Sequence, residues 1–217
     1  MWDGFPIIRT RYRGGMSTTR VSLEIGKTWV FASALDWPGW CRRGKGEEAA
    51  LEALVDYSDR YAAVVGAGFT PGEPEVIGRV PGTSTTDFGA PDARGAWDDE
   101  PLGAGETARL AAVLVSCWTA FDRVVSAAPA ELRKGPRGGG RDRDAVADHV
   151  REAERSYGRK IGVRVPPRTP WTDQRAALLE VLRTGTSAGD WPARYAFRRI
   201  AWHVLDHAWE IEDKSVP

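Results

Sequence analysis

The feature that most constrains this fold is a helical periodicity that fills the C-terminal half of the chain. Apolar residues recur every three or four positions in four successive segments, at about residues 106–128, 142–156, 172–183 and 191–213. Four amphipathic helices joined by modest connections bury their apolar faces most readily against one another. The pattern therefore predicts an up-down four-helix bundle.

The same periodicity predicts which faces of these helices point inward. The third helix should bury Ala176, Leu179 and Leu182, with Thr172 as its N-cap. The last helix should begin near Pro192, since proline suits a first helical turn. Its inward stripe is predicted to consist of Ala196, Ile200, His203, Val204, His207 and Ile211.

The N-terminal part has a different pattern. Residues 20–25 alternate apolar and polar side chains, and Gly26-Lys27 suits a two-residue turn before a second strand at residues 28–35. A helix is then predicted from Glu47 to Val65, and its apolar stripe consists of Leu51, Leu54, Val55, Ser58, Ala62 and Val65. Residues 1–70 are therefore predicted to contain a strand-strand-helix unit.

Two connecting segments separate these parts. Residues 71–103 are rich in proline, glycine, threonine and aspartate, which indicates a linker with room for an edge strand at Val76, Ile77 and Val80. Residues 133–141 are glycine-rich and basic, which indicates a mobile loop. The predicted fold class is α+β, with the small unit packed against a bundle at residues 104–217.

Composition limits the function classes. The 30 basic and 30 acidic residues cancel, so a general nucleic-acid or membrane-surface binder is not expected. The N-terminus lacks a secretion-signal pattern, and no apolar run approaches the length that spans a bilayer. A cytoplasmic location without membrane contact is expected. Cys41 and Cys117 are accordingly predicted to be free thiols.

The three histidines of the chain suggest a metal site. His203 and His207 are four residues apart, so both side chains lie on one face of a helix. His149 occupies an inward position of another predicted helix, which could complete a three-histidine cluster. The alternative is that the pair is packed or lies on the surface, with His149 unrelated to it.

Three neutral imidazoles would leave a coordination position open on a divalent ion. Zinc is the first expectation, with nickel or iron as alternatives. Such an ion could activate water or a thiolate. Arg199 and Glu210 lie one turn either side of the histidine pair, so they are candidates for acid–base or anion-holding roles, the alternative being surface ion pairs. Asp148 and Asp206 are placed outside the ligand set or on the surface.

Residues 105–215 resemble the DinB-like superfamily of metal-binding four-helix bundles. Members commonly place one histidine on the second helix and an H-x-x-x-H pair on the fourth, and His149, His203 and His207 match these positions. The ending RYAFRRIAWHVLDHAWEIED, residues 194–213, also looks like members of that group. The resemblance implies a divalent metal, and the superfamily includes transferases and isomerases that use mycothiol or bacillithiol.

Residues 17–68 are similar to the HicB-like fold. The similarity rests on the predicted hairpin, on Trp37-Pro38-Gly39-Trp40-Cys41 and on Gly44-Lys45-Gly46-Glu47-Glu48-Ala49. Gly46 stands where the family usually has a capping serine or threonine, and the DNA-binding element of HicB antitoxins is lacking. An antitoxin role is therefore not implied.

The leading hypothesis is a metal-dependent enzyme that uses its three-histidine site to activate a low-molecular-weight thiol or water for attack on a small electrophilic substrate. The alternative is a non-catalytic metal-binding interaction module with a HicB-like protein-binding unit. RNA or toxin binding is the third option, and it is disfavoured because residues 20–60 have no basic excess. A homodimer is left open.

Overall fold

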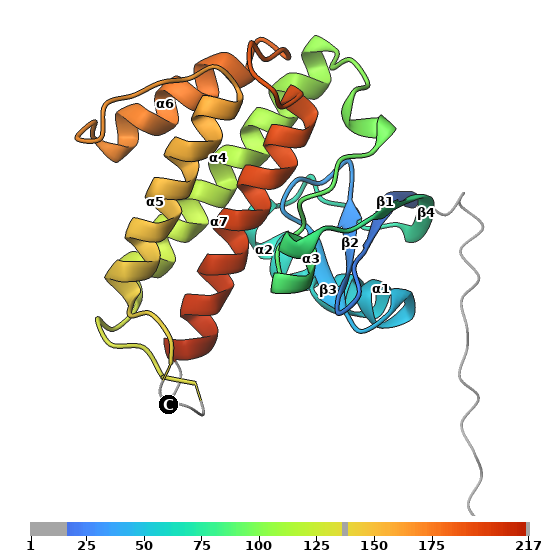
Figure 1. Cartoon of the computed structure of the whole chain (residues 1–217), viewed down its shortest axis with the longest axis horizontal. Coiled ribbons are helices and arrows are strands. Elements are labelled where there is room, and N and C mark those ends of the chain that lie inside the picture. The colour runs from blue at the N-terminus through green and yellow to red at the C-terminus, as the bar shows by residue number, and fades with distance from the viewer. Residues whose placement is uncertain (1–16, 136–138, 216–217) are drawn as a thin grey trace, which may run out of the picture.

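The protein combines a mixed four-stranded sheet with a group of long helices, which makes it an α+β protein. The computed structural model describes residues 17–135 and 139–215. Figure 1 shows the sheet and its short helices on one side and the long helices on the other. Residues 1–16 and part of the predicted basic loop, residues 136–138, lie outside the described residues.

The sheet contains β1 (Thr18–Ile25), β2 (Val30–Ala34), β3 (Cys41–Gly44) and β4 (Glu73–Pro81). Its order is β3-β2-β1-β4, in which β1 pairs antiparallel with β2 and parallel with β4. The predicted hairpin is present, with Leu23 opposite Ala32. β3 was not predicted, because its four residues include two arginines and follow a turn rich in proline and glycine.

The single helix predicted from Glu47 to Val65 is in fact two helices, α1 (Glu47–Asp56) and α2 (Ser58–Val65). The indole N–H of Trp40 donates a hydrogen bond of 2.7 Å to the carbonyl of Leu54. In a continuous helix the Leu54 carbonyl would accept a hydrogen bond from the backbone N–H four residues later. Its hydrogen bond with Trp40 therefore accompanies the break at Tyr57. Val55, which the sequence assigned to the buried stripe, is 46% exposed.

The segment between the two parts contains regular structure of its own. After β4 come α3 (Ser84–Phe88) and the short 3₁₀ helix η1 (Ala96–Asp98). Most buried apolar side chains of the sheet and of the long helices form one cluster, to which Leu23, Trp40 and Leu205 belong, and Phe31, Cys41 and Trp202 form a second. The separation of the chain at residues 71–103 stays a prediction.

The four long helices are α4 (Ala104–Ala127), α5 (Arg143–Lys160), α6 (Trp171–Leu182) and α7 (Ala193–Ser215), and they pack against one another. The prediction for α6 was wrong in detail. Its N-cap is Pro170, so Thr172 lies inside the first turn, and Ala176 is exposed. Its buried residues are Gln174, Arg175, Leu178 and Leu182.

α7 lies between the other long helices and the sheet, as Figure 1 shows. It is therefore buried on more than the single predicted stripe. Trp202 packs edge-on against Phe31 of β2, with 6.1 Å between ring centroids. Gly39 has φ 94°, and a Cβ there would stand 2.8 Å from Leu205 Cδ1, so the turn before β3 requires glycine to approach α7.

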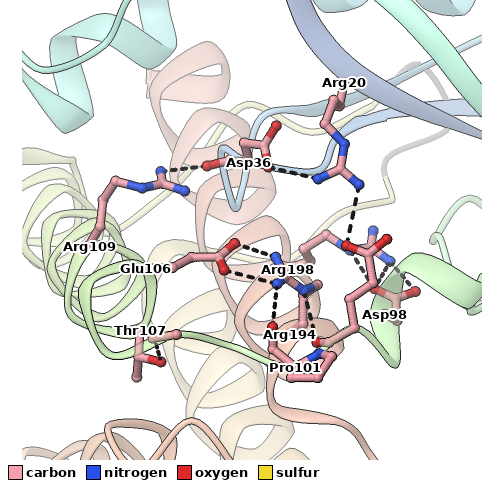
Figure 2. Close-up of polar contacts among 11 residues, drawn as sticks. Arg20, Asp36, Asp98, Pro101, Glu106, Thr107, Arg109, Arg194 and Arg198 are labelled. Carbon is pink, nitrogen blue, oxygen red and sulfur yellow. Dashed lines mark hydrogen bonds and ion pairs between the residues drawn. The ribbon is translucent and has the colours of Figure 1, made fainter.

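Polar contacts fix the segment near η1 and the sheet to the long helices (Figure 2). Arg198 of α7 binds both carboxylate oxygens of Asp98 at 2.7 Å, and Arg194 pairs with Glu106 at the start of α4. Arg109 of α4 donates to the carbonyl of Asp36 at 2.6 Å, and Arg20 of β1 lies 3.5 Å from the Asp36 carboxylate. These contacts join α7, α4 and the sheet at one place.

α4 is long and apolar enough to cross a membrane by length and composition alone, contrary to the expectation that no apolar run approaches that length. Half of its most apolar stretch is buried inside the protein. A core helix of a soluble protein has the same property, so α4 is weak support for a membrane span.

Candidate metal centre

α5 and α7 lie side by side and bring the three histidines together. The ring of His149 on α5 lies 5.1 Å from that of His203 and 4.9 Å from that of His207, measured between centroids. The two rings of α7 are 4.6 Å apart, as expected for residues one helical turn from each other. The cluster predicted from the spacing of the histidines is present.

The nitrogen atoms of the cluster have a spacing that suits a metal ion. The Nε2 atoms of His149 and His203 are 3.3 Å apart, and the three candidate ligand atoms all lie within 4.8 Å of one another. Two nitrogens bound at about 2.0–2.1 Å in a tetrahedron would be separated by about 3.3 Å. His149, His203 and His207 could therefore bind a metal ion.

Glu210 determines which nitrogen of His207 faces the cluster. Its carboxylate lies 2.7 Å from His207 Nδ1 and also pairs with Lys214. The hydrogen bond from His207 is the main reason that the pKa of Glu210 falls to about 2. A carboxylate on Nδ1 leaves Nε2 free as the ligand atom, which is the usual arrangement around metal-binding histidines.

The centre is buried on one side and has both arginines and the Glu210 carboxylate near it. His203 is 6% exposed, whereas His149 and His207 are half-buried. Burial is the main cause that lowers the pKa of both His149 and His203. Neighbouring cations, which include Arg141, lower both values further. Both imidazoles are thus held in the neutral form that binds metal. Nδ1 of His203 is buried without a hydrogen-bond partner in the described structure.

The other predicted site residues fall outside the ligand group. Asp148 is exposed, and Asp206 pairs with Arg42 at 3.2 Å. Arg199 is 8% exposed and lies beside the Tyr157 and Trp202 rings. Cys41 and Cys117 are both free and buried, and neither is in the cluster.

Tyr157 is a neighbour of the centre that sequence reasoning missed. Its ring lies 5.6 Å from that of His203, edge to face. It follows His149 by eight residues, which places both on one face of α5. The eight-residue separation from His149 is the sequence feature that could have identified Tyr157 as a neighbour of the centre.

Comparison with protein-family models, with curated proteins and with solved structures finds no match to this chain. The interpretation of the site therefore rests on its own geometry.

Proposed function

We propose that the protein is a divalent-metal enzyme related to the DinB-like bundles, with zinc as the first expected ion and nickel or iron as alternatives. The proposal also includes a HicB-like fold for the sheet unit. When bound at the three histidines, the ion would supply Lewis-acid activation of water or of a thiol such as mycothiol for attack on a small electrophile. The histidines sit on the second and fourth long helices, in the order that the resemblance implies.

The observation that carries this proposal is the composition of the ligand group. Three imidazoles and no carboxylate or thiolate make up the one group found among residues 17–135 and 139–215 that could hold a metal ion. Closed structural zinc sites have four protein ligands, whereas catalytic sites have three and an open position. The half-buried His149 and His207 leave a side of the cluster that solvent reaches.

The residues of this chain would contribute binding and orientation. Glu210 holds His207 with Nε2 toward the other histidines. Burial keeps His203 neutral, and the aromatic rings of Tyr157 and Trp202 exclude water from one side of it. This arrangement lowers the entropic cost of assembling the ligands.

The first test is the metal content of protein purified without an affinity tag. One divalent ion per chain is expected in the native protein, and His149→Ala should lose most of it while the helices remain folded by circular dichroism. Asp148→Ala is the matched control, because Asp148 is the exposed neighbour of His149 on the same helix. Full metal retention in His149→Ala would contradict the three-ligand site.

A second test separates an open site from a closed one. Cys117 is fully buried on α4, and burial raises the pKa of its thiol strongly, which disfavours the thiolate that binds metals. Cys117→Ala should therefore keep its metal. Added azide or thiol should change the visible spectrum of the cobalt-substituted protein. A resting spectrum with sulfur ligation that is lost in Cys117→Ala would favour the non-catalytic metal-binding module instead.

A further inference from the structure

Arg199 is a buried cation without a carboxylate partner in the described structure. Its side chain is 8% exposed, and its Nε and Nη1 atoms have no hydrogen-bond partner among the described residues. The other buried arginines of the long helices are paired: Arg175 with Glu154 and Asp122, and Arg194 with Glu106. A buried, unpaired charge is costly, so a site that retains one usually receives an opposite charge from a ligand.

The guanidinium lies in the same aromatic surroundings as the metal centre. It stands 5.2 Å from the centroid of the Tyr157 ring and 4.7 Å from that of Trp202. Both of these rings also contact His203, at 5.6 Å and 6.0 Å between centroids. Arg199 precedes His203 by one helical turn, so a ligand on Arg199 would lie beside the histidine cluster.

Arg199 also borders a cavity between the sheet and α7. The cavity measures about 20 Å³, which is room for one or two water-sized groups. Three other polar side chains in its wall already have partners. Arg198 binds Asp98, the Tyr195 hydroxyl donates to the carbonyl of Asp92, and Ser33 donates to Cys41.

Glu24 is the acidic group in the wall of this cavity, and it is satisfied elsewhere. Its carboxylate accepts hydrogen bonds from the Thr86 hydroxyl and from the backbone N–H groups of Asp92 and Ala93. Burial raises the pKa of the Glu24 carboxyl, while the three donors lower it. Glu24 makes no ion pair with Arg199 in the described structure.

We infer that Arg199 and this cavity form a binding site for a carboxylate group of the molecule on which the protein acts. The substrate class is then a small carboxylic acid anchored at Arg199, one helical turn along α7 from His203. The link to a reaction rests on the proposed function. The anion site itself does not, because Arg199 and the cavity are present without a metal ion. A water molecule in the cavity is the competing occupant.

The test is a titration of the full-length protein with acetate, followed by NMR through the indole N–H signal of Trp202. Trp202→Phe assigns that signal. Acetamide serves as the uncharged analogue, and chloride as an anion without carboxylate shape. Acetate should bind saturably in both metal-free and zinc-loaded protein, more tightly than chloride, and acetamide should not bind. Arg199→Gln should weaken acetate binding at least about tenfold, because charge-assisted hydrogen bonds are lost.

Two matched variants control for folding and for total charge. Arg199→Lys keeps the charge and should bind acetate with intermediate affinity. Arg183→Gln removes an exposed arginine at the end of α6 and should leave binding unchanged.

The outcomes separate this inference from the proposed function. The inference is overturned if Arg199→Gln binds acetate as tightly as the native protein does. It is also overturned if acetamide binds as tightly as acetate, as expected for a cavity that holds water. So would chloride binding as tight as acetate. Acetate binding that needs zinc and is insensitive to Arg199 would make acetate a metal ligand, which overturns the inference but leaves the metal site. Absence of metal binding would overturn the proposed function, while the metal-free titration still decides the anion site.

Discussion

The contact between Glu210 and His207 shows how a single residue can set the properties of this site. An imidazole binds metal through the nitrogen that lacks a proton, and a carboxylate on Nδ1 fixes the proton there. Glu210 is held in turn by Lys214, one helical turn further along α7. Glu210 therefore contacts the cluster through the ring of His207, and its expected role is to position that ring.

Removing Glu210 should therefore weaken metal binding without abolishing it. We expect Glu210→Ala to lower metal affinity by about 10–100-fold, in the range typical of residues that orient metal ligands. Glu210→Gln should lose less, because its amide oxygen can still accept a hydrogen bond from His207 Nδ1. Competition with a chromophoric chelator measures both affinities.

Glu212→Ala is the matched control for this change. Glu212 is two residues away on the same helix and binds Arg60 instead, with 2.7 Å between Oε2 and Nη2. Its variant should bind metal as the native protein does. Complete metal loss in Glu210→Ala, equal to that of the histidine variants, would mean that Glu210 is itself a ligand.

At the residue scale, much of the candidate site could be predicted from sequence. The spacing of His203 and His207 is a local helical property, and the inward position of His149 follows from its apolar neighbours. The lack of a carboxylate partner for Arg199 could not be predicted. It depends on which acidic side chains other elements place nearby: Glu106 and Asp98 pair with other arginines, and Glu24 accepts from backbone N–H groups.

At the scale of single elements, α5 and α6 are joined by a buried polar network around Glu154. This side chain is fully buried and accepts hydrogen bonds from the indole N–H groups of Trp118 and Trp171, at 2.8 Å and 2.5 Å. It also pairs with Arg175 of α6 at 3.2 Å. The network ties α4, α5 and α6 together, one to two turns from His149 along α5.

Glu154→Ala should destabilise the protein strongly. It leaves Arg175 and two indole N–H groups buried with fewer partners, and breaking a buried pair in this way typically costs about 3–5 kcal/mol of unfolding free energy. Urea denaturation of the metal-free protein measures the change. Asp122→Ala, which removes the exposed partner of the same arginine, should cost about 1 kcal/mol or less. Equal costs for the two variants would contradict a special role for Glu154.

The elements themselves were predicted where periodicity is long and one-sided. α4, α5 and α7 were found with ends within a few residues, since their apolar stripes extend over several turns. The inner face of α6 was predicted wrongly because its buried face includes the polar Gln174 and Arg175, which a hydrophobicity pattern assigns to solvent. β3 and the break at Tyr57 depend on tertiary contacts, namely pairing with β2 and the hydrogen bond from Trp40.

At the scale of the whole molecule, the sheet covers a face of α7 that the other long helices leave open. Trp202 packs on Phe31, and Leu205 lies against the turn at Gly39. Both side chains of α7 are almost fully buried by this packing. The apolar periodicity of the last helix predicted one inward stripe. Periodicity does not reveal that a second layer packs on the opposite face of the helix.

The packing of the sheet against α7 leads to the last prediction. A fragment of residues 103–217 keeps all three histidines but exposes Trp202 and Leu205. Burying a large apolar side chain stabilises a protein by about 1.5–3 kcal/mol, so these two alone should lower the unfolding free energy of the fragment by about 3 kcal/mol or more. We expect the fragment to bind a hydrophobic dye and to unfold at lower urea concentration than the full chain.

Trp202→Ser with Leu205→Ser in the fragment provides the control. These changes should reduce dye binding, because they remove the apolar face that the sheet normally covers, whereas in the full-length protein they should be strongly destabilising. Metal content of the fragment is measured in parallel, since the histidine cluster is formed by α5 and α7 alone. A fragment that matches the full chain in stability and does not bind the dye would mean that residues 104–217 fold independently, as the composition of the linker predicts.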